Sequence, residues 1–241
     1  MIHDRINSKY IDCSKLTMDT IVAKDYYIAS LDILGGKKLI FQDKNNKHLN
    51  AIKNIYTSWI SINKGSSNVF PLLKFKIFSD NIILDIDAEC KDGLDYLLEF
   101  AADLANHFLT SEYKPRGGIC KGPLYIDDTF VRGSGLVEAY EMESETAIYP
   151  RIILTSDIVN FASKRVSDAM IFYDANHDGW TYLNYLRAFG RNRQRWVDDI
   201  SMAKEILNKE IKAEKAEKII DKLEWLQEFI DTNLNYWESK C

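Results

Sequence analysis

The chain has 241 residues, a length that suits one large domain or one domain with an extension. Hydrophobic residues make up 46% of it and charged residues 28%, which excludes a largely disordered chain, a collagen-like repeat and a disulfide-stapled mini-domain. Lysine and arginine number 31 against 36 aspartate and glutamate residues, so the formal net charge is −5. Because proteins that bind long nucleic acids normally carry a basic surplus, we expect no nucleic-acid partner.

The spacing of the cysteines and the absence of long apolar runs limit the kinds of metal site and the cellular compartment that we expect. The four cysteines lie far apart, and none stands at zinc-binding spacing from another cysteine or from a histidine. Residues 1–24 lack the apolar run of a signal peptide, and no stretch approaches the roughly 18 apolar residues of a membrane-spanning helix. We therefore expect a cytoplasmic protein with free thiols and no membrane partner.

The predicted elements alternate in type along the chain. Short runs of β-branched and aromatic residues indicate strands, and apolar residues at helical spacing indicate helices. The expected order is strand 26–34, helix 38–62, strands 72–78 and 82–86, helix 94–109, strand 115–121 ended by Gly122 and Pro123, helix 137–142 and strand 151–155.

This order is βαββαβ with a further helix and strand, and it predicts an α+β fold with a ferredoxin-like palm. In such a palm the first and third strands pair centrally, which brings Asp32 beside the hairpin that contains Asp80. The composition shifts after Tyr173, and one or two long helices are expected over 200–236. We expect three parts: an N-terminal extension, 1–24; the palm domain, 25–175; and a C-terminal helical extension that packs on the core or on a dimer partner, 176–241.

Two aspartates stand where strands end. Asp32 lies near the end of the first strand, and Asp80 lies in the turn of the hairpin. Two carboxylates that meet repel each other, and a pair of divalent cations relieves that repulsion. Mg²⁺ or Mn²⁺ suits such oxygen ligands, and two ions can serve the attacking and leaving oxygens of a phosphoryl transfer. Either aspartate alone is more often a helix cap or a turn former, so the prediction depends on the pair.

A glycine turn follows the first aspartate. Gly35, Gly36 and Lys37 come directly after the strand and start the next helix. Backbone N–H groups in such a turn can bind phosphate, and the helix dipole favours the negative charge. Two glycines between a strand and a helix also have a purely structural interpretation.

Four motifs in order resemble those of class III nucleotidyl cyclases, over about residues 25–175. LDILGG resembles the first metal motif, and KIFSDNI resembles the second, with Lys76 four residues before Asp80. RGGICKGPLY, which begins at Arg116, is similar to the family's Arg-x-Gly-Ile-x-x-Gly strand. GSGLVEAYEMES and YPRIILTSD fall where the family places its last active-site helix and strand. The resemblance implies that 25–175 is a class III cyclase-like catalytic domain.

The SD, RGGI and AYEMES…YPRI segments most resemble the pyrimidine cyclases of bacterial anti-phage Pycsar systems. That resemblance implies a homodimer with active sites at the interface. It also implies two Mg²⁺ or Mn²⁺ ions on Asp32 and Asp80, assisted by the carbonyl of Ile33. The implied reaction converts UTP, or less favourably CTP, to the 3′,5′-cyclic nucleotide and pyrophosphate. The product would activate a separate effector in antiviral defence.

The chain departs from purine cyclases on its late helix. Those enzymes place an asparagine and, four residues later, a transition-state arginine where this chain has Val137 and Glu141. The departure favours the pyrimidine branch and requires cations from elsewhere. The candidate substrate-binding residues are Gly35, Gly36, Lys37, Lys76, Arg116, Arg132 and Arg151. Lys121 is a further candidate cation.

Several of these residues keep a second interpretation. The position of Lys76 contacts the base in purine cyclases, but a lysine on an edge strand also suits the surface. Arg116 and Arg151 either bind substrate or anchor strands or the dimer through ion pairs. Two other functions also remain: a purine cyclase, and a catalytically silent nucleotide-binding module that the missing arginine favours. The sequence leaves the choice between UTP and CTP open.

Overall fold

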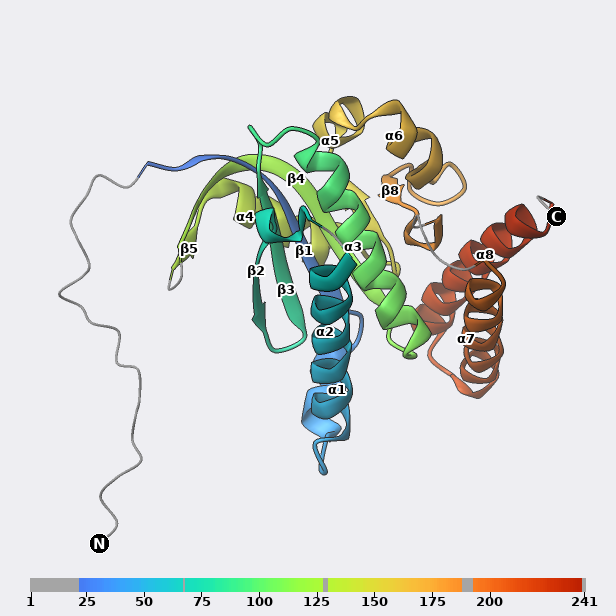
Figure 1. Cartoon of the computed structure of the whole chain (residues 1–241). Coiled ribbons are helices and arrows are strands. Elements are labelled where there is room, and N and C mark those ends of the chain that lie inside the picture. The colour runs from blue at the N-terminus through green and yellow to red at the C-terminus, as the bar shows by residue number, and fades with distance from the viewer. Residues whose placement is uncertain (1–21, 67, 128–129, 188–192, 240–241) are drawn as a thin grey trace, which may run out of the picture.

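The computed structural model describes residues 22–66, 68–127, 130–187 and 193–239 (Figure 1). Most of the expected N-terminal extension, residues 1–21, lies outside this description. The described strands are β1 Lys24–Ile33, β2 Lys74–Phe78, β3 Asn81–Asp87, β4 Pro115–Ile126, β5 Val131–Arg132, β6 Ile152–Leu154, β7 Ile171–Tyr173 and β8 Thr181–Leu183. The described helices are α1 Gly36–Gln42, α2 Lys47–Ser66, α3 Gly93–Thr110, α4 Ser134–Glu141, α5 Ser156–Phe161, α6 Lys164–Met170, α7 Arg193–Ala213 and α8 Glu217–Glu238.

One sheet organises the described chain. Its strand order is β2-β3-β1-β4-β6-β8-β7, with β5 paired to β4 outside this path. The first strand, β1, pairs antiparallel with β3 on one side and with β4 on the other, while β4 and β6 run parallel. The expected α+β palm with its central first and third strands is confirmed.

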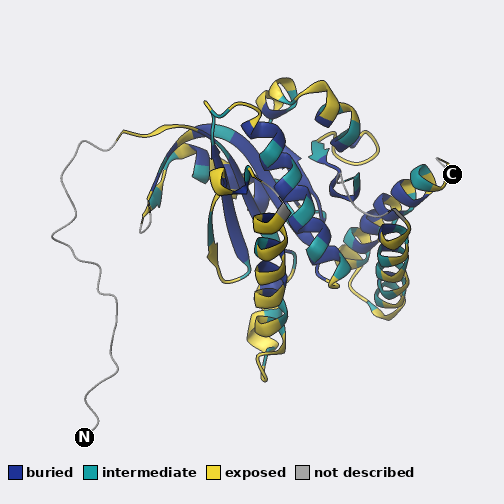
Figure 2. Cartoon of the chain, in the orientation of Figure 1, coloured by how far each residue is buried: buried dark blue, intermediate teal, exposed yellow. Residues whose placement is uncertain are grey.

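Helices cover both faces of the sheet (Figures 1 and 2). Ala29, Leu31 and Ile33 of β1 belong to the large core cluster shared with α2 and α3, whereas Tyr26 and Ile28 belong to a second cluster under α4. Alternate residues of a strand point to opposite faces, so a strand covered on both faces reads as one apolar run. This explains why β1 was recognisable from the sequence.

The α4 helix packs very close to β4. A side chain at Gly118 would place its Cβ 2.4 Å from the Cβ of Met142, the residue that directly follows α4. Glycine at this position therefore lets the end of α4 approach the sheet. The chain then passes through one π-helical turn, Met142–Thr146, before it returns to β6.

The predicted bounds of one helix and one strand were wrong. The helix expected over 38–62 is two helices, because the carboxylate of Asp43 accepts hydrogen bonds from the backbone N–H groups of His48, at 3.2 Å, and Leu49, at 2.9 Å, and so starts α2 afresh. The strand expected to stop before Gly122 continues through Pro123 to Ile126. β6 pairs with β4 only over residues 117–119, so one edge of β4 has no described strand beside Pro123. Proline has no backbone N–H to donate, and a strand tolerates this where no neighbouring strand needs that hydrogen bond.

The C-terminal region contributes to the same structure. β8 pairs with β6, so the sheet continues beyond residue 175. Two long helices follow, α7 and α8, which pack against each other, and α7 also contacts α3 (Figure 1). Within the described residues, none of the helices is both long and apolar enough to cross a membrane.

Candidate active site

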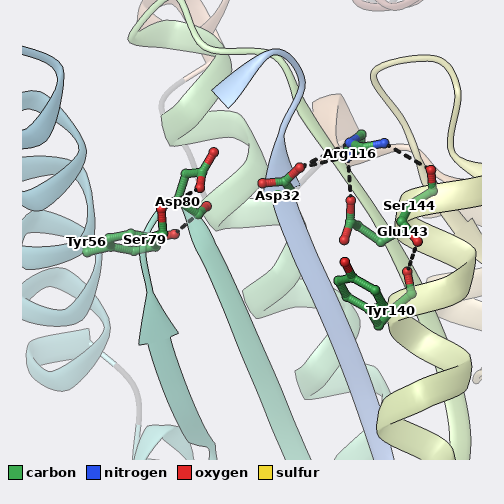
Figure 3. Close-up of polar contacts among 8 residues, drawn as sticks. All are labelled: Asp32, Tyr56, Ser79, Asp80, Arg116, Tyr140, Glu143 and Ser144. Atoms are coloured by element: carbon green, nitrogen blue, oxygen red, sulfur yellow. Dashed lines mark hydrogen bonds and ion pairs between the residues drawn. The ribbon is translucent and has the colours of Figure 1, made fainter. Parts of the chain in front are cut away.

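The ends of β1 and of the β2–β3 hairpin place two carboxylates side by side (Figure 3). Asp32 is the second-to-last residue of β1, and Asp80 lies in the turn directly before β3, the neighbouring strand. Burial raises the pKa of Asp32, and the negative charge of Asp80 raises it further, while the guanidinium of Arg116 opposes both effects. The predicted juxtaposition of these two aspartates is therefore present in the structure.

The Asp80 carboxylate lies directly against the glycine turn. A Cβ added to Gly36 would stand 1.5 Å from Oδ2 of Asp80 and 2.7 Å from its Cγ. The preceding residue, Gly35, has a φ of 82°, in the left-handed region that favours glycine. Gly35 therefore permits the turn, and Gly36 leaves the space that the Asp80 carboxylate occupies.

Local hydrogen bonds fix the Asp80 turn. The Tyr56 hydroxyl donates to the Asp80 backbone carbonyl at 3.2 Å, and the Ser79 hydroxyl donates to Oδ1 of Asp80 at 2.9 Å. Burial raises the pKa of Tyr56, with smaller contributions from the charges of Asp80 and Asp32, so this phenol stays protonated as a donor. Ser79 itself has a φ of 59°. A tyrosine on α2 thus ties the helical layer to the carboxylate-bearing turn.

Arg116 holds Asp32 from the next strand. Its Nη2 lies 2.9 Å from Oδ2 of Asp32 and 2.8 Å from Oε1 of Glu143, and its Nε donates to the same Asp32 oxygen at 3.2 Å. Glu143, from the π-helical turn, has a side chain only 2% exposed. Burial raises its pKa to about 7, against the opposing effect of Arg116. One guanidinium therefore balances the partly buried carboxyl group of Asp32 and the buried carboxyl group of Glu143 on the β1 side of the site.

The donor set fits hard divalent cations. The two carboxylates and the neighbouring Ile33 carbonyl are oxygen ligands, which Mg²⁺ and Mn²⁺ prefer. Among the described residues there is no cluster of three or more His, Cys, Asp or Glu side chains suited to a metal. Such a site suits an ion that one or two carboxylates and substrate phosphates hold together. The Arg116 cation beside Asp32 shows that this position attracts positive charge.

The other predicted site residues fall into two groups. Lys37 is exposed on α1, directly after Gly36, and Lys76 is partly buried on β2, opposite Ile83 of β3. Both therefore lie on elements that flank Asp80. Lys121, further along β4, forms an ion pair with Asp25 at 3.8 Å and lies 5.2 Å from the ring centroid of Phe161.

Two predicted arginines lie elsewhere in this chain. Arg132 is exposed on β5, where it pairs with Tyr125 of β4. Tyr125 lies nine positions along β4 from Arg116, a separation of roughly 30 Å. The Arg151 side chain is fully buried and forms ion pairs with Asp174, at 2.5 Å, and with Asp178. Of the two roles considered for Arg151, the structure shows the anchoring ion pairs and does not bring its guanidinium to Asp32.

Glu143 and Tyr56 were not predicted as site residues. Glu143 sits in an acidic segment, EMESE, where its spacing does not distinguish it from Glu141 or Glu145, and only the π-helical turn directs it to Arg116. In the sequence, Tyr56 looks like one of the apolar residues of a core helix, and in the structure it is only 5% exposed. The residues at the two positions that depart from purine cyclases, Val137 and Glu141, are both exposed on α4.

Solved structures share this fold. The dimeric guanylyl cyclase domain of the RhoGC fusion protein from the fungus Blastocladiella emersonii is 16% identical, with a TM-score of 0.51, over 71% of this chain and 99% of that domain. The monomeric form of the same fungal domain is 14% identical, with a TM-score of 0.51, over 71% and 99% of the two chains. No protein-family model matches the chain, and no curated protein matches it. At these identities the likeness establishes the cyclase fold and no finer property.

Proposed function

We propose that the protein is a nucleotidyl cyclase that converts a pyrimidine nucleoside triphosphate, UTP or CTP, to its 3′,5′-cyclic monophosphate and pyrophosphate. The observation that carries this proposal is the meeting of Asp32 and Asp80 beside Gly36, on the fold of a guanylyl cyclase domain. The reaction is an attack of the ribose 3′-oxygen on the α-phosphorus, with loss of pyrophosphate. Anti-phage signalling through a cyclic-nucleotide effector is part of the same proposal and rests on the resemblance alone.

Asp32, Asp80 and the Ile33 carbonyl would hold two Mg²⁺ or Mn²⁺ ions, which favour the 3′-alkoxide and neutralise the triphosphate. Tyr56 and Ser79 keep the Asp80 turn in one geometry through their hydrogen bonds. Gly36 supplies the space for the carboxylate, and the turn around it offers N–H groups to phosphate. Positioning and fixed charge supply most of the acceleration in phosphoryl transfer, so no side-chain base is required.

Arg116 is the cation best placed to bind the triphosphate. It contacts Asp32 directly, and Glu143 holds it from the other side. Lys37, next to Gly36, is a second cation at the same edge. Arg116 and Lys37 are the proposed replacements for the transition-state arginine of purine cyclases, whose position is Glu141 in this chain. Arg151 instead forms ion pairs with Asp174 and Asp178.

Exposed apolar side chains support assembly as a homodimer. Val137 and Tyr140 of α4 are 54% and 52% exposed, and Ile77 and Phe78 at the end of β2 are 39% and 54% exposed. Large apolar side chains that are half exposed in one chain suit burial against a partner. The RhoGC guanylyl cyclase domain is described as dimeric in one of its structures, and we propose the same assembly here.

Two other functions have support. A purine cyclase agrees with the fold of the guanylyl cyclase domain. A silent nucleotide-binding module is favoured by Val137 and Glu141 in the place of the purine cyclases' catalytic pair. Incubation with UTP, CTP, ATP and GTP in turn, with Mg²⁺ or Mn²⁺, separates all three. Pyrophosphate and a cyclic pyrimidine nucleotide support the proposal, a cyclic purine nucleotide overturns its specificity, and no pyrophosphate from any of the four overturns the enzyme.

A further inference from the structure

The C-terminal helices lie against the loop that leads into β4. Leu207 of α7 and Leu226 of α8 line one small cavity together with Leu109, near the end of α3, and Tyr113, in the loop that follows. All four side chains belong to the large buried core cluster. Figure 1 shows the two helices beside the end of α3. The loop that they cover reaches Arg116 three residues after Tyr113.

Glu210 of α7 holds this loop through an ion pair. Its Oε2 lies 2.7 Å from Nζ of Lys114, the residue directly before β4. The backbone carbonyl of Lys114 accepts a hydrogen bond from the N–H of Leu34 at 2.8 Å. Leu34 stands directly between Ile33 and the glycine turn of the candidate active site. Glu210 is thus one residue away from the backbone that joins β4 to the catalytic end of β1.

Trp225 of α8 makes a second contact, through Asp174 and Arg151. The indole N–H of Trp225 donates to Oδ2 of Asp174 at 2.9 Å, and the same oxygen lies 2.5 Å from Nη1 of Arg151. The Arg151 side chain is fully buried, and its guanidinium lies 5.7 Å from the ring centroid of Trp225. The backbone carbonyl of Arg151 accepts a hydrogen bond from the N–H of Gly117 at 3.0 Å. The α8 helix is therefore linked to the residue that directly follows Arg116.

We propose that Glu210 and Trp225 are positioning residues for Arg116, so that the pair of helices α7 and α8 sets how well its guanidinium meets the substrate triphosphate. This inference rests on the proposed cyclase function, in which Arg116 binds the triphosphate, and it gives the C-terminal helices a role in that site. The two contacts end on the backbone on either side of Arg116, at Lys114 and at Gly117.

The placement of Arg116 matters because several anions compete for it. Its guanidinium contacts the carboxylates of Asp32 and Glu143, and the triphosphate would be a third anion. An arginine binds phosphate best when its planar fork of donors is aligned with the phosphate oxygens. A small movement of the backbone at Lys114 or Gly117 would shift that fork toward one anion or another. The expected consequence is a change in the affinity for triphosphate.

The test measures calorimetric binding of inorganic tripolyphosphate, in the presence of Mn²⁺, to the full chain and to two variants. Glu210→Gln keeps the size of the side chain and removes its charge, and Trp225→Phe keeps an aromatic ring and removes the N–H donor. Each variant should bind about fivefold more weakly, within the range that substitutions remote from a site produce. KM for UTP should rise by the same factor, and kcat should change less than KM.

Asp231→Asn is the matched control. Asp231 of α8 forms an ion pair of 2.6 Å with Lys204 of α7, so it joins the two helices to each other and not to the loop before β4. Its side chain is 38% exposed, as is that of Glu210. The control variant should bind tripolyphosphate as the wild-type protein does.

Arg116→Met shows whether the two residues act through Arg116. In that background Glu210→Gln and Trp225→Phe should cause no further loss of affinity, because the group that they position is gone. Additive losses with Arg116→Met, or an equal loss in Asp231→Asn, would overturn the inference. If Trp225→Phe does not fold, Glu210→Gln in the partly exposed ion pair decides, and an unchanged affinity in it overturns the inference too.

The binding and turnover measurements separate this inference from the proposed function. A wild-type protein that binds tripolyphosphate but releases no pyrophosphate from any nucleoside triphosphate refutes the cyclase, while the losses in Glu210→Gln and Trp225→Phe still support the positioning role. Pyrophosphate release with the wild-type KM in both variants keeps the cyclase and refutes the positioning role.

Discussion

Replacing Gly36 by alanine tests the active-site geometry with a single methyl group. The new Cβ would stand 1.5 Å from Oδ2 of Asp80, and carbon and oxygen atoms in contact are normally more than 3 Å apart. The Asp80 carboxylate must therefore retreat by about 2 Å. Because it is the end of a side chain and not backbone, it can rotate away without disturbing the sheet. The variant should fold normally and lose its metal geometry.

The expected magnitude follows from that displacement. A misplacement of about 1 Å costs roughly 100-fold in rate, so kcat should fall by at least that factor, or about 3 kcal/mol of transition-state stabilisation. The free energy of unfolding should stay within about 1 kcal/mol of wild type, since alanine is the better helix former at the start of α1. The assay is Mn²⁺-dependent pyrophosphate release, with urea unfolding measured in parallel.

Gly65→Ala is the matched control for this substitution. Gly65 lies in α2 with no atom within 4 Å of an added Cβ, so this variant should keep full activity. Full activity of Gly36→Ala would refute the placement of Asp80 in the catalytic centre. A large loss of stability in that variant would refute the argument that only the carboxylate must move.

Three further predictions concern charge. Asp32→Asn and Asp80→Asn should each abolish metal-dependent turnover, as measured by product chromatography, with normal circular dichroism; retained turnover in either variant would remove the metal assignment. Arg151→Met should lower the free energy of unfolding by about 3–5 kcal/mol, because Asp174 and Asp178 lose their buried partner, and a change below about 1 kcal/mol in urea unfolding would contradict this. Burial raises the pKa of Asp85, on β3, from 3.8 to about 6, so the folded state holds its proton more tightly, and stability should fall by up to about 3 kcal/mol as the pH rises through that window. Asp85→Asn should remove that slope, and identical pH profiles of stability for variant and wild type would contradict the assignment.

The sequence was sufficient to predict the palm and the juxtaposition of Asp32 with Asp80. Both follow from local signals, namely an apolar run that ends at two glycines and a turn between two strands, combined with the pairing rule of a βαββαβ fold. β1 was the clearest element because both of its faces are covered. The turn at Asp43 was missed because side-chain capping is specified by single residues and not by periodicity.

Residues whose roles depend on distant partners were beyond the reach of sequence patterns. Arg151 stands next to a proline in a motif that resembles an active-site strand, but its partners, Asp174 and Asp178, are more than twenty positions away. Glu143 is placed by a π-helical turn, a rare feature with no periodic signature. The burial of the Asp85 carboxylate without a hydrogen-bond partner among the described residues is visible only in three dimensions, because its sequence context is that of an ordinary buried strand.

We expect Asp32 and Asp80 to share two divalent cations with the substrate. Equilibrium dialysis of Mn²⁺ in the presence of an unreactive UTP analogue, with an α,β-methylene bridge, measures this directly. We expect two Mn²⁺ ions per chain for the wild-type protein, with loss of binding in both Asp32→Asn and Asp80→Asn. Equal Mn²⁺ binding by all three proteins would contradict it.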